Sequence, residues 1–152
     1  MAFTHLHVHT EYSLLDGSNK IKEYVARVKE LGMNSAAITD HGVMYGVIDF
    51  YRAAREAGIK PILGCEVYVA PDSRFDKELT GGEERYHHHH LVLLAENNTG
   101  YANLMKIVSR GFTEGYYYKP RVDMEVLQEF HEGIIALSAC LAGEVPRFIL
   151  KG

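Results

Sequence analysis

The sequence predicts an α/β fold in which strands and helices alternate along one domain. Short apolar runs of strand length alternate with segments whose apolar residues recur at helical spacing. The chain has 152 residues, a length typical of one domain, and 47% of them are apolar. Neither a glycine- and serine-rich linker nor an internal repeat divides it. We therefore expect one largely parallel sheet covered by helices.

The first part of the chain predicts two strands and two helices in alternation. Apolar and polar residues alternate in FTHLHVH with the period of a strand, and SAAIT is a short apolar run. Two longer segments place apolar residues at helical spacing, and Gly32 and Gly58 stand where a glycine commonly ends a helix. The elements expected here are a strand at 3–9, a helix at 21–31, a strand at 35–39 and a helix at 45–57.

The second part predicts three more strands and three more helices. PILGCEVYVA, HHLVLLA and GIIALSA are apolar runs of strand length, and Pro61 stands at the start of the first, where a strand tolerates proline. PDSRFDKELTGGEERY is a polar, charged stretch that predicts an exposed loop, and EGYYYKPRVD predicts a second loop. The elements expected here are strands at 61–70, 89–95 and 133–139, the last of them buried, helices at 99–108, 123–131 and from 143 onward, and loops at 71–86 and 114–123.

Composition and charge exclude several classes of protein. No run of about 18 apolar residues exists, so we expect no transmembrane helix, and MAFTHLHVHT lacks the regions of a signal peptide. Two cysteines without a CxxC motif predict a cytoplasmic protein. A net charge of −4 argues against a free-standing nucleic-acid binder. The unusual count is nine histidines, seven of them within residues 5–9 and 87–90.

Residues of the types that bind metals lie on the expected strands or directly after them. His7 and His9 are two residues apart on an expected strand, so they share a face, although a pair of surface or core histidines is the alternative. Asp40 and His41 end the next strand, as ligands or as a helix N-cap with an incidental histidine. Glu66 stands in an apolar strand, where a carboxylate is costly to bury unless it is paired or metal-bound. The alternative is that Glu66 faces outward at an edge of the sheet.

Three further positions are ambiguous when taken alone. Asp16 precedes a glycine and has the composition of a turn. Of the four histidines at 87–90 we expect one to be a ligand and the others to be exposed. Cys140 ends an expected buried strand, where most cysteines only pack. Because ligand sites in α/β folds lie beyond the carboxyl ends of the strands, the whole set predicts a site for several metal ions there.

Six segments, taken in order, resemble a known family. HLHVHTEYSLLDG, AAITDHGVMYG, GCEVYVAP, HHLVLLAENNTGYANL, GYYYKPRVD and GIIALSACLAGEVP are similar to the opening segment of bacterial replicative DNA polymerase III alpha subunits. That segment is a PHP (polymerase and histidinol phosphatase) domain. The resemblance runs from Phe3 to Pro146. TEYSLLDG and NNTGYANL indicate the polymerase branch of the family rather than a stand-alone histidinol phosphatase.

The resemblance implies a distorted β/α barrel that holds up to three divalent metal ions, typically zinc or manganese. It implies a supporting role for Asp40 beside a set of metal ligands: His7, His9, Asp16, His41, Glu66, His90 and Cys140. The family completes this site with an Asp-x-His motif on a later strand, which the sequence lacks. We therefore expect residues 1–152 to be the N-terminal portion of a PHP domain, truncated before the end of the barrel and without the polymerase domains.

The resemblance also implies a function in DNA replication. It predicts a metal-dependent phosphoesterase-type site, which in some members is a 3′-to-5′ proofreading exonuclease. Two other functions stay open: a catalytically inactive metal-binding module that braces the polymerase, and a small-molecule phosphatase of the histidinol-phosphate type. The expected partners are the rest of the alpha subunit, DNA through the full-length protein, and other replisome subunits, with no membrane.

Overall fold

A computed structural model describes residues 3–77 and 88–152, and its α/β class is as predicted. Six strands form one sheet in the order β4-β5-β2-β3-β6, and β1 also pairs with β2. The strands are β1 (Ser35–Ile38), β2 (Lys60–Val69), β3 (His89–Ala95), β4 (Tyr116–Tyr117), β5 (Lys119–Val122) and β6 (Ile134–Leu137). The helices are α1 (Ile21–Glu30), α2 (Val47–Ala57), α3 (Asn98–Thr113), α4 (Met124–Glu129) and α5 (Glu144–Lys151).

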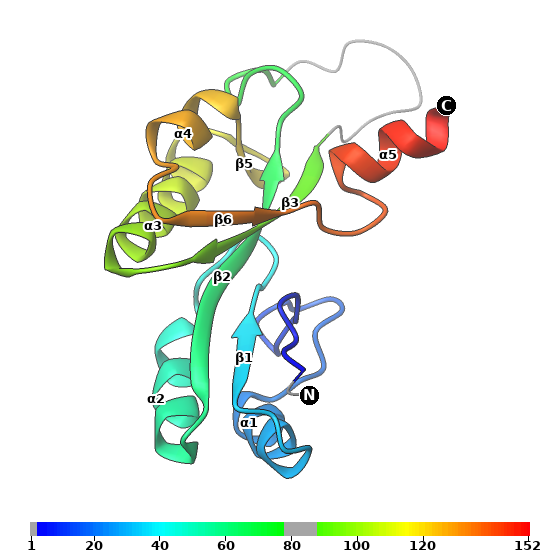
Figure 1. Ribbon diagram of the computed structural model, residues 1–152. Helices are drawn as coiled ribbons and strands as arrows, with labels where there is room; N and C mark the ends of the chain where they lie inside the picture. The colour runs from blue at the N-terminus through cyan, green and yellow to red at the C-terminus, as the bar shows by residue number, and fades with distance from the viewer. Residues whose placement is uncertain (1–2, 78–87) are drawn as a thin grey trace.

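β2 is the long central strand, and Figure 1 shows it running from the α1–α2 end of the molecule to the α3–α4 end. It pairs in parallel with β1 near its start and with β5 near its end, and antiparallel with β3 on its other edge. β3 and β6 are also antiparallel, as are β4 and β5. The expectation of a largely parallel sheet is therefore wrong. β3 returns from β2 without a crossover helix among the described residues, and such a return gives an antiparallel pair.

Two groups of helices cover the two ends of β2. α1 and α2 bury an apolar cluster against β1 that includes Ile38 and Phe50, and α3 and α4 bury a second cluster that includes Leu104 and Ile107. Complete burial of each such side chain contributes about 1.5–3 kcal/mol to folding. The helix ends predicted at Gly32 and Gly58 are confirmed. No helix within the described ranges is long and apolar enough to cross a membrane.

Residues 3–9, which we call the N-terminal segment, do not form the expected strand. The segment lies beside β1, where Ala37 N donates to His5 O at 3.1 Å and Thr39 N donates to Val8 O at 2.8 Å. The two acceptors are three residues apart and the two donors are two apart. The register therefore slips by one residue, and a regular ladder of hydrogen bonds cannot form.

Two expectations about the second half are also wrong. The expected loop at 114–123 contains β4 and β5, because Tyr68 and Val69 at the end of β2 pair with this segment. β6 is not a buried strand, and Ile135 is 47% exposed. Among the described residues β6 pairs only with β3, so its other edge is open. The remaining helices and strands lie close to where the sequence predicts them, and α3 extends further, to Thr113.

Candidate metal centre

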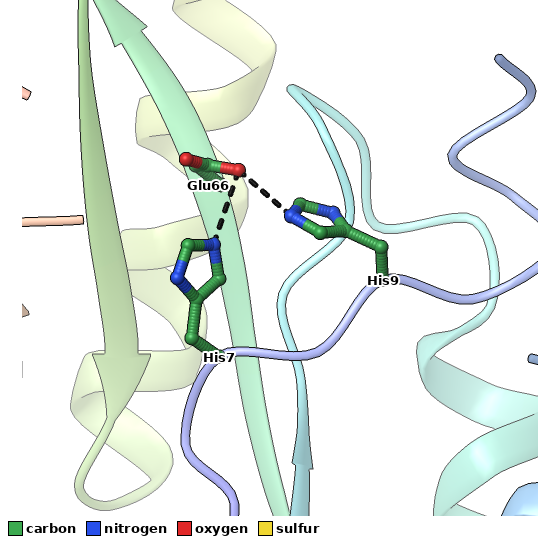
Figure 2. Close-up of side chains that lie close together, drawn as sticks. All are labelled: His7, His9 and Glu66. Carbon is green, nitrogen blue, oxygen red and sulfur yellow. Dashed lines mark ion pairs between the residues drawn. The ribbon is translucent and has the colours of Figure 1, made fainter. Parts of the chain in front are cut away.

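Glu66 on β2 is the centre of a cluster of predicted site residues, and its side chain is only 1% exposed. Its Oε2 atom lies 3.2 Å from His7 Nε2, 3.0 Å from His9 Nε2 and 3.0 Å from His41 Nδ1. Figure 2 shows the rings of His7 and His9 pointing from the N-terminal segment toward this one oxygen. Its Oε1 atom lies 2.9 Å from His90 Nδ1. Four imidazoles therefore surround one buried carboxylate.

Backbone pairing brings these side chains together from distant parts of the sequence. Glu66 N donates to Asp40 O at 3.0 Å, and Gly42 N donates to Glu66 O at 2.8 Å. The chain that leaves β1 therefore continues beside β2 and places His41 next to Glu66. On the other edge of β2, Val92 is opposite Glu66. His90 is two residues from Val92 on the same strand, so its side chain projects from the same face as Glu66.

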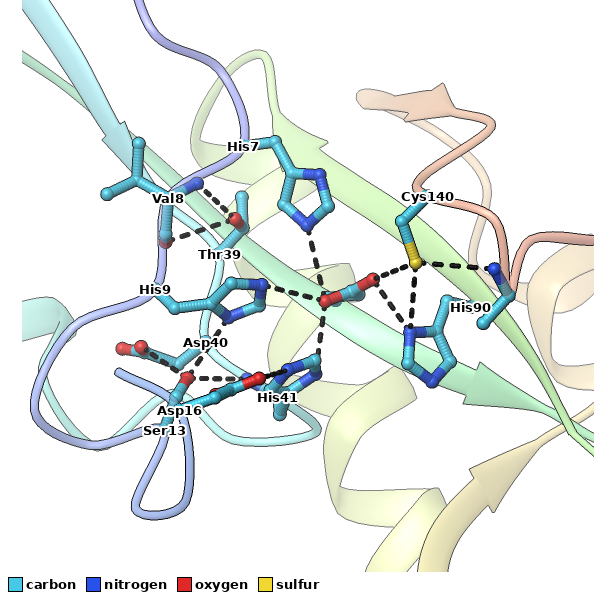
Figure 3. Close-up of polar contacts among 12 residues, drawn as sticks. His7, Val8, His9, Ser13, Asp16, Thr39, Asp40, His41, His90 and Cys140 are labelled. Atoms are coloured by element: carbon cyan, nitrogen blue, oxygen red, sulfur yellow. Dashed lines mark hydrogen bonds and ion pairs between the residues drawn. The ribbon is translucent and has the colours of Figure 1, made fainter. Parts of the chain in front are cut away.

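Asp16 and Cys140 lie at opposite sides of the cluster, as Figure 3 shows. Asp16 Oδ2 is 2.9 Å from His41 Nε2, and the Asp16 side chain is 57% exposed. Cys140 Sγ is 3.7 Å from His90 Nδ1 and 4.0 Å from Glu66 Oε1. The loop of Cys140 is held there because His90 N donates to the carbonyl of Ala142 at 3.0 Å. The seven predicted ligands thus lie together, and their role as ligands stays a prediction.

Some buried polar atoms of the cluster have no hydrogen-bond partner. Glu66 Oε2 and His41 Nδ1 are both buried, and neither atom has a hydrogen-bond partner although they are 3.0 Å apart. Leaving a buried polar atom unpaired costs about 1–3 kcal/mol, so each case calls for an explanation such as an ion.

A divalent metal ion would be such an explanation. Ligand atoms at about 2.0–2.2 Å from one ion lie roughly 2.8–3.6 Å from each other, with octahedral coordination at the short end of this range and tetrahedral coordination at the long end. The nitrogen-to-oxygen distances of 3.0–3.2 Å around Glu66 Oε2 agree with this spacing. Imidazole and carboxylate are also the ligands that zinc and manganese accept. The residues present therefore fit a divalent metal ion.

The charges of Glu66 and His41 stabilise each other. Burial alone would raise the pKa of Glu66, but the neighbouring imidazoles, His41 foremost, lower it well below its usual range. Contact with the Glu66 carboxylate in turn raises the pKa of His41, against the effect of burial, and Asp16 adds to this rise. Glu66 is therefore a fixed negative charge at the centre of the cluster.

Asp40 faces the loop of residues 10–19 rather than the cluster. It is buried, and its Oδ1 accepts hydrogen bonds from Thr10 N at 2.6 Å and Ser13 Oγ at 2.8 Å, while its Oδ2 accepts one from Thr10 Oγ1 at 2.8 Å. Gly17 lets this loop close, because a Cβ atom there would overlap the carbonyl oxygen of Thr10. The alternative interpretation of Asp40 as a helix N-cap is wrong, since α2 begins only at Val47.

Sequence reasoning missed the two hydroxyl residues of this loop and misplaced part of the histidine tract. Thr10 and Ser13 are buried partners of Asp40, but hydroxyl residues in a polar loop look like ordinary turn residues in a sequence. The expectation that the rest of the tract is exposed is wrong for His88 and His89, which are both half-buried, and the ring of His88 lies 4.7 Å from that of Tyr68. Burial lowers the pKa of His88 to about 4. His87 lies outside the described residues.

Comparisons with known proteins point in the same direction as the cluster. The sequence matches the PHP domain family over residues 5–152. It is 51% identical to DNA polymerase III subunit alpha of Treponema pallidum, covering 100% of this chain and 13% of that protein. It is 54% identical to the same subunit of Helicobacter pylori strain 26695, covering 95% of this chain and 12% of that protein.

A solved structure of an amidohydrolase from Chromobacterium violaceum, with bound sulfate and no metal, is also similar. Its TM-score is 0.47 at 26% identity, and the match covers 72% of this chain and 34% of that one. The chain spans 12–13% of the length of the two DNA polymerase III alpha subunits.

Proposed function

The chain belongs to the PHP domain family, and from this premise we propose that residues 1–152 are the N-terminal portion of the PHP domain of a DNA polymerase III alpha subunit. We propose a metal-dependent phosphoesterase-type site for this domain. One observation carries the proposal: a buried carboxylate surrounded by four imidazoles, with buried polar atoms that make no hydrogen bond. The similarity to alpha subunits over 95–100% of the chain supports the assignment to the polymerase.

The ligands would act in three overlapping groups, each of which places its ligand atoms within 4.8 Å of one another. The groups are His7, His9 and Glu66; His9, Asp16 and His41; and His41, Glu66 and His90. Three such groups are compatible with up to three ions, with zinc or manganese as the expected metals. The thiol of Cys140 lies beside His90 and would add a sulfur ligand at that side. When bound, the ions would neutralise phosphate charge and lower the pKa of an attacking water.

The exposure of the cluster defines the side from which a phosphate would approach. Glu66 is buried behind the rings of His7, His9, His41 and His90, which are 16–31% exposed. Asp16 is more exposed and lies against the outer nitrogen of His41. The chain therefore holds its fixed negative charge at the back of the site. The partly exposed imidazole rings line the side that is open to solvent, where a substrate phosphate would enter.

We propose 3′-to-5′ exonuclease activity as the reaction that tests this function. The purified chain, loaded with manganese or zinc, is incubated with DNA labelled at its 3′ end. Release of mononucleotides is expected, and both a chelator and His9→Ala should abolish it. His131→Ala is the matched control, because His131 is an exposed histidine outside the cluster whose ring contacts the carbonyl of Gln128. Turnover of a phosphomonoester without any cleavage of DNA would favour the small-molecule phosphatase instead.

A second candidate function is a structural metal site that braces the polymerase. It is favoured by the reach of the cluster, which joins the N-terminal segment, the end of β1, β2, β3 and the loop after β6. A metal ion there would cross-link five parts of the fold, and metal binding can serve stability alone. Metal binding with a large loss of melting temperature on chelation, but no hydrolysis, would identify this function.

The proposed partners follow from the alpha-subunit assignment. We propose that the domain acts in DNA replication together with the rest of the alpha subunit, with DNA through that subunit and with other replisome subunits. The cytoplasmic location stays a prediction from cysteine usage.

A further inference from the structure

Ser13 lies where three site residues meet, although it belongs to none of the ligand groups. Its buried Oγ is 2.8 Å from Asp40 Oδ1, 3.1 Å from the backbone N of His41 and 3.1 Å from His9 Nδ1. Figure 3 shows Ser13 between Asp40 and the rings of His9 and His41. One hydroxyl group therefore contacts a supporting carboxylate, the main chain of one predicted ligand and the side chain of another.

The hydrogen of this hydroxyl is directed at Asp40. A serine hydroxyl has one hydrogen and two lone pairs, and a carboxylate oxygen only accepts. The contact with Asp40 Oδ1 is the shortest of the three, and a hydrogen bond to a charged oxygen is the strongest available. If the hydrogen pointed at His9 instead, lone pairs of Ser13 Oγ and Asp40 Oδ1 would face each other at 2.8 Å.

The two lone pairs of Ser13 Oγ then receive two hydrogens. The backbone N–H of His41 only donates, and it uses one lone pair. The other lone pair faces His9 Nδ1, so that nitrogen must carry a hydrogen. A neutral imidazole has one N–H and one bare nitrogen, which leaves His9 Nε2 with its lone pair.

We propose that Ser13 is a positioning residue that fixes His9 in the tautomer with hydrogen on Nδ1. Its importance for metal binding rests on the proposed function. His9 Nε2 is the atom that lies 3.0 Å from Glu66 Oε2, and only a bare imidazole nitrogen binds a metal ion. A lone pair that faces a carboxylate oxygen at this distance is repelled by it, and a bound cation would relieve that repulsion. Asp40 acts on His9 through Ser13, in the way that carboxylates commonly orient metal-binding histidines.

The test combines ring nitrogen NMR with metal titration of the chain. Nitrogen-15 spectra of metal-free protein at mildly alkaline pH, where imidazoles are neutral, report which nitrogen of His9 carries the hydrogen. We expect hydrogen on Nδ1 in the wild type and a mixture of tautomers in Ser13→Ala. Titration calorimetry with manganese or zinc alone should show affinity about 10–100-fold weaker in Ser13→Ala, the usual cost of losing such a partner.

Thr10→Val is the matched control. It removes the other hydroxyl that donates to Asp40, without removing any contact with His9. The tautomer of His9 and the metal affinity of Thr10→Val should stay close to those of the wild type. Ser13→Thr keeps a hydroxyl and should restore the Nδ1 tautomer.

Two results would contradict the role of Ser13. One is a wild-type His9 that carries its hydrogen on Nε2, and this result requires no variant to fold. The other is a folded Ser13→Ala with the wild-type tautomer and affinity. A wild type that binds neither metal would contradict the proposed function instead, while the tautomer measurement would still decide the role of Ser13.

Discussion

Two buried clusters of charged side chains in this molecule are built in different ways. In the cluster of Arg74, the guanidinium donates to Glu114 at 2.7 Å, to Glu125 at 2.7 Å and to Asp123 at 3.0 Å. The contacts of its central cation are hydrogen bonds with carboxylates. In the cluster of Glu66, a carboxylate oxygen and a ring nitrogen lie 3.0 Å apart without a hydrogen bond.

We infer from this difference that the Arg74 cluster is structural and that the Glu66 cluster is functional. Arg74 joins the segment after β2 to the end of α3 and the start of α4, where Asp123 also accepts from Val126 N as the N-cap. Because its charges are paired within the protein, this network can stabilise the fold on its own. The Glu66 cluster instead leaves buried polar atoms without a hydrogen bond, and unsatisfied groups of this kind concentrate at functional sites.

The largest expected effect is the loss of stability when the structural cluster is broken. Arg74→Met should lower the free energy of unfolding by about 3–5 kcal/mol, because it leaves the buried Asp123 carboxylate without its charged partner. Denaturant unfolding measures this change. Arg52→Met, at an exposed arginine on α2, should change it by no more than about 0.5 kcal/mol. A loss below 1 kcal/mol in Arg74→Met would show that the network is not the structural one.

The next effect concerns the functional cluster and depends on metal. Manganese or zinc at 100 times its dissociation constant should raise the free energy of unfolding by about 2.7 kcal/mol. Thermal unfolding with and without a chelator measures this increment. The same increment should persist in a folded Arg74 variant such as Arg74→Lys, because the two clusters share no residue. If neither metal changed the free energy of unfolding, the Glu66 cluster would not differ from the Arg74 cluster in the way described.

The sequence was sufficient to predict this cluster but not the hydrogen bonds behind it. Strand-length runs and the family resemblance placed His41, Glu66 and His90 at positions that the structure brings together. The loop expected at 71–86 already allowed an antiparallel pair of strands, but the alternation of strands and helices along the rest of the chain predicted a parallel sheet. The irregular path of residues 3–9 depends on a register slip against β1, which no periodicity reveals.

Ser13 shows the same limit at the level of a single side chain. Its role depends on an oxygen of Asp40, which is 27 residues away in the sequence and reaches it only after folding. A local pattern therefore cannot distinguish it from a turn serine. Arg74 is a similar case, because its partners lie 40–51 residues later in the chain.

A smaller effect is expected when the structural cluster is titrated with acid. Burial opposes it, but hydrogen bonds from Arg74 and Val126 lower the pKa of Asp123. The unfolded value is about 3.9, so the contribution to stability is complete above about pH 4 and is lost as pH falls through the lower folded value. As pH is lowered, the free energy of unfolding should therefore fall less steeply in Asp123→Asn than in the wild type. This variant keeps a side chain that can act as the N-cap. Identical slopes in the two proteins would contradict the charge pairing.

The smallest effect is expected at Cys140, the exposed side of the functional cluster. Cys140→Ser should change the stability of the metal-free protein by no more than about 0.5 kcal/mol, because the residue is exposed. Its effect on metal affinity should be smaller than that of His9→Ala, since Sγ lies 4.0 Å from Glu66 Oε1 whereas His9 Nε2 lies 3.0 Å from Glu66 Oε2. Titration calorimetry of both variants measures the two losses of metal affinity. A larger loss in Cys140→Ser than in His9→Ala would show that Cys140 is the more important ligand.

The central claim is that the Glu66 cluster binds divalent metal through contacts that the protein leaves incomplete. Titration calorimetry of manganese and zinc tests it most directly in the wild type, in Glu66→Gln and in Glu125→Gln, a carboxylate of the other cluster. The wild type and Glu125→Gln should bind with similar affinity. Glu66→Gln, which keeps the shape and removes the charge, should bind more than about 100-fold more weakly, beyond the usual cost of losing an outer partner. Equal affinity in Glu66→Gln, or no binding in the wild type, would contradict the account.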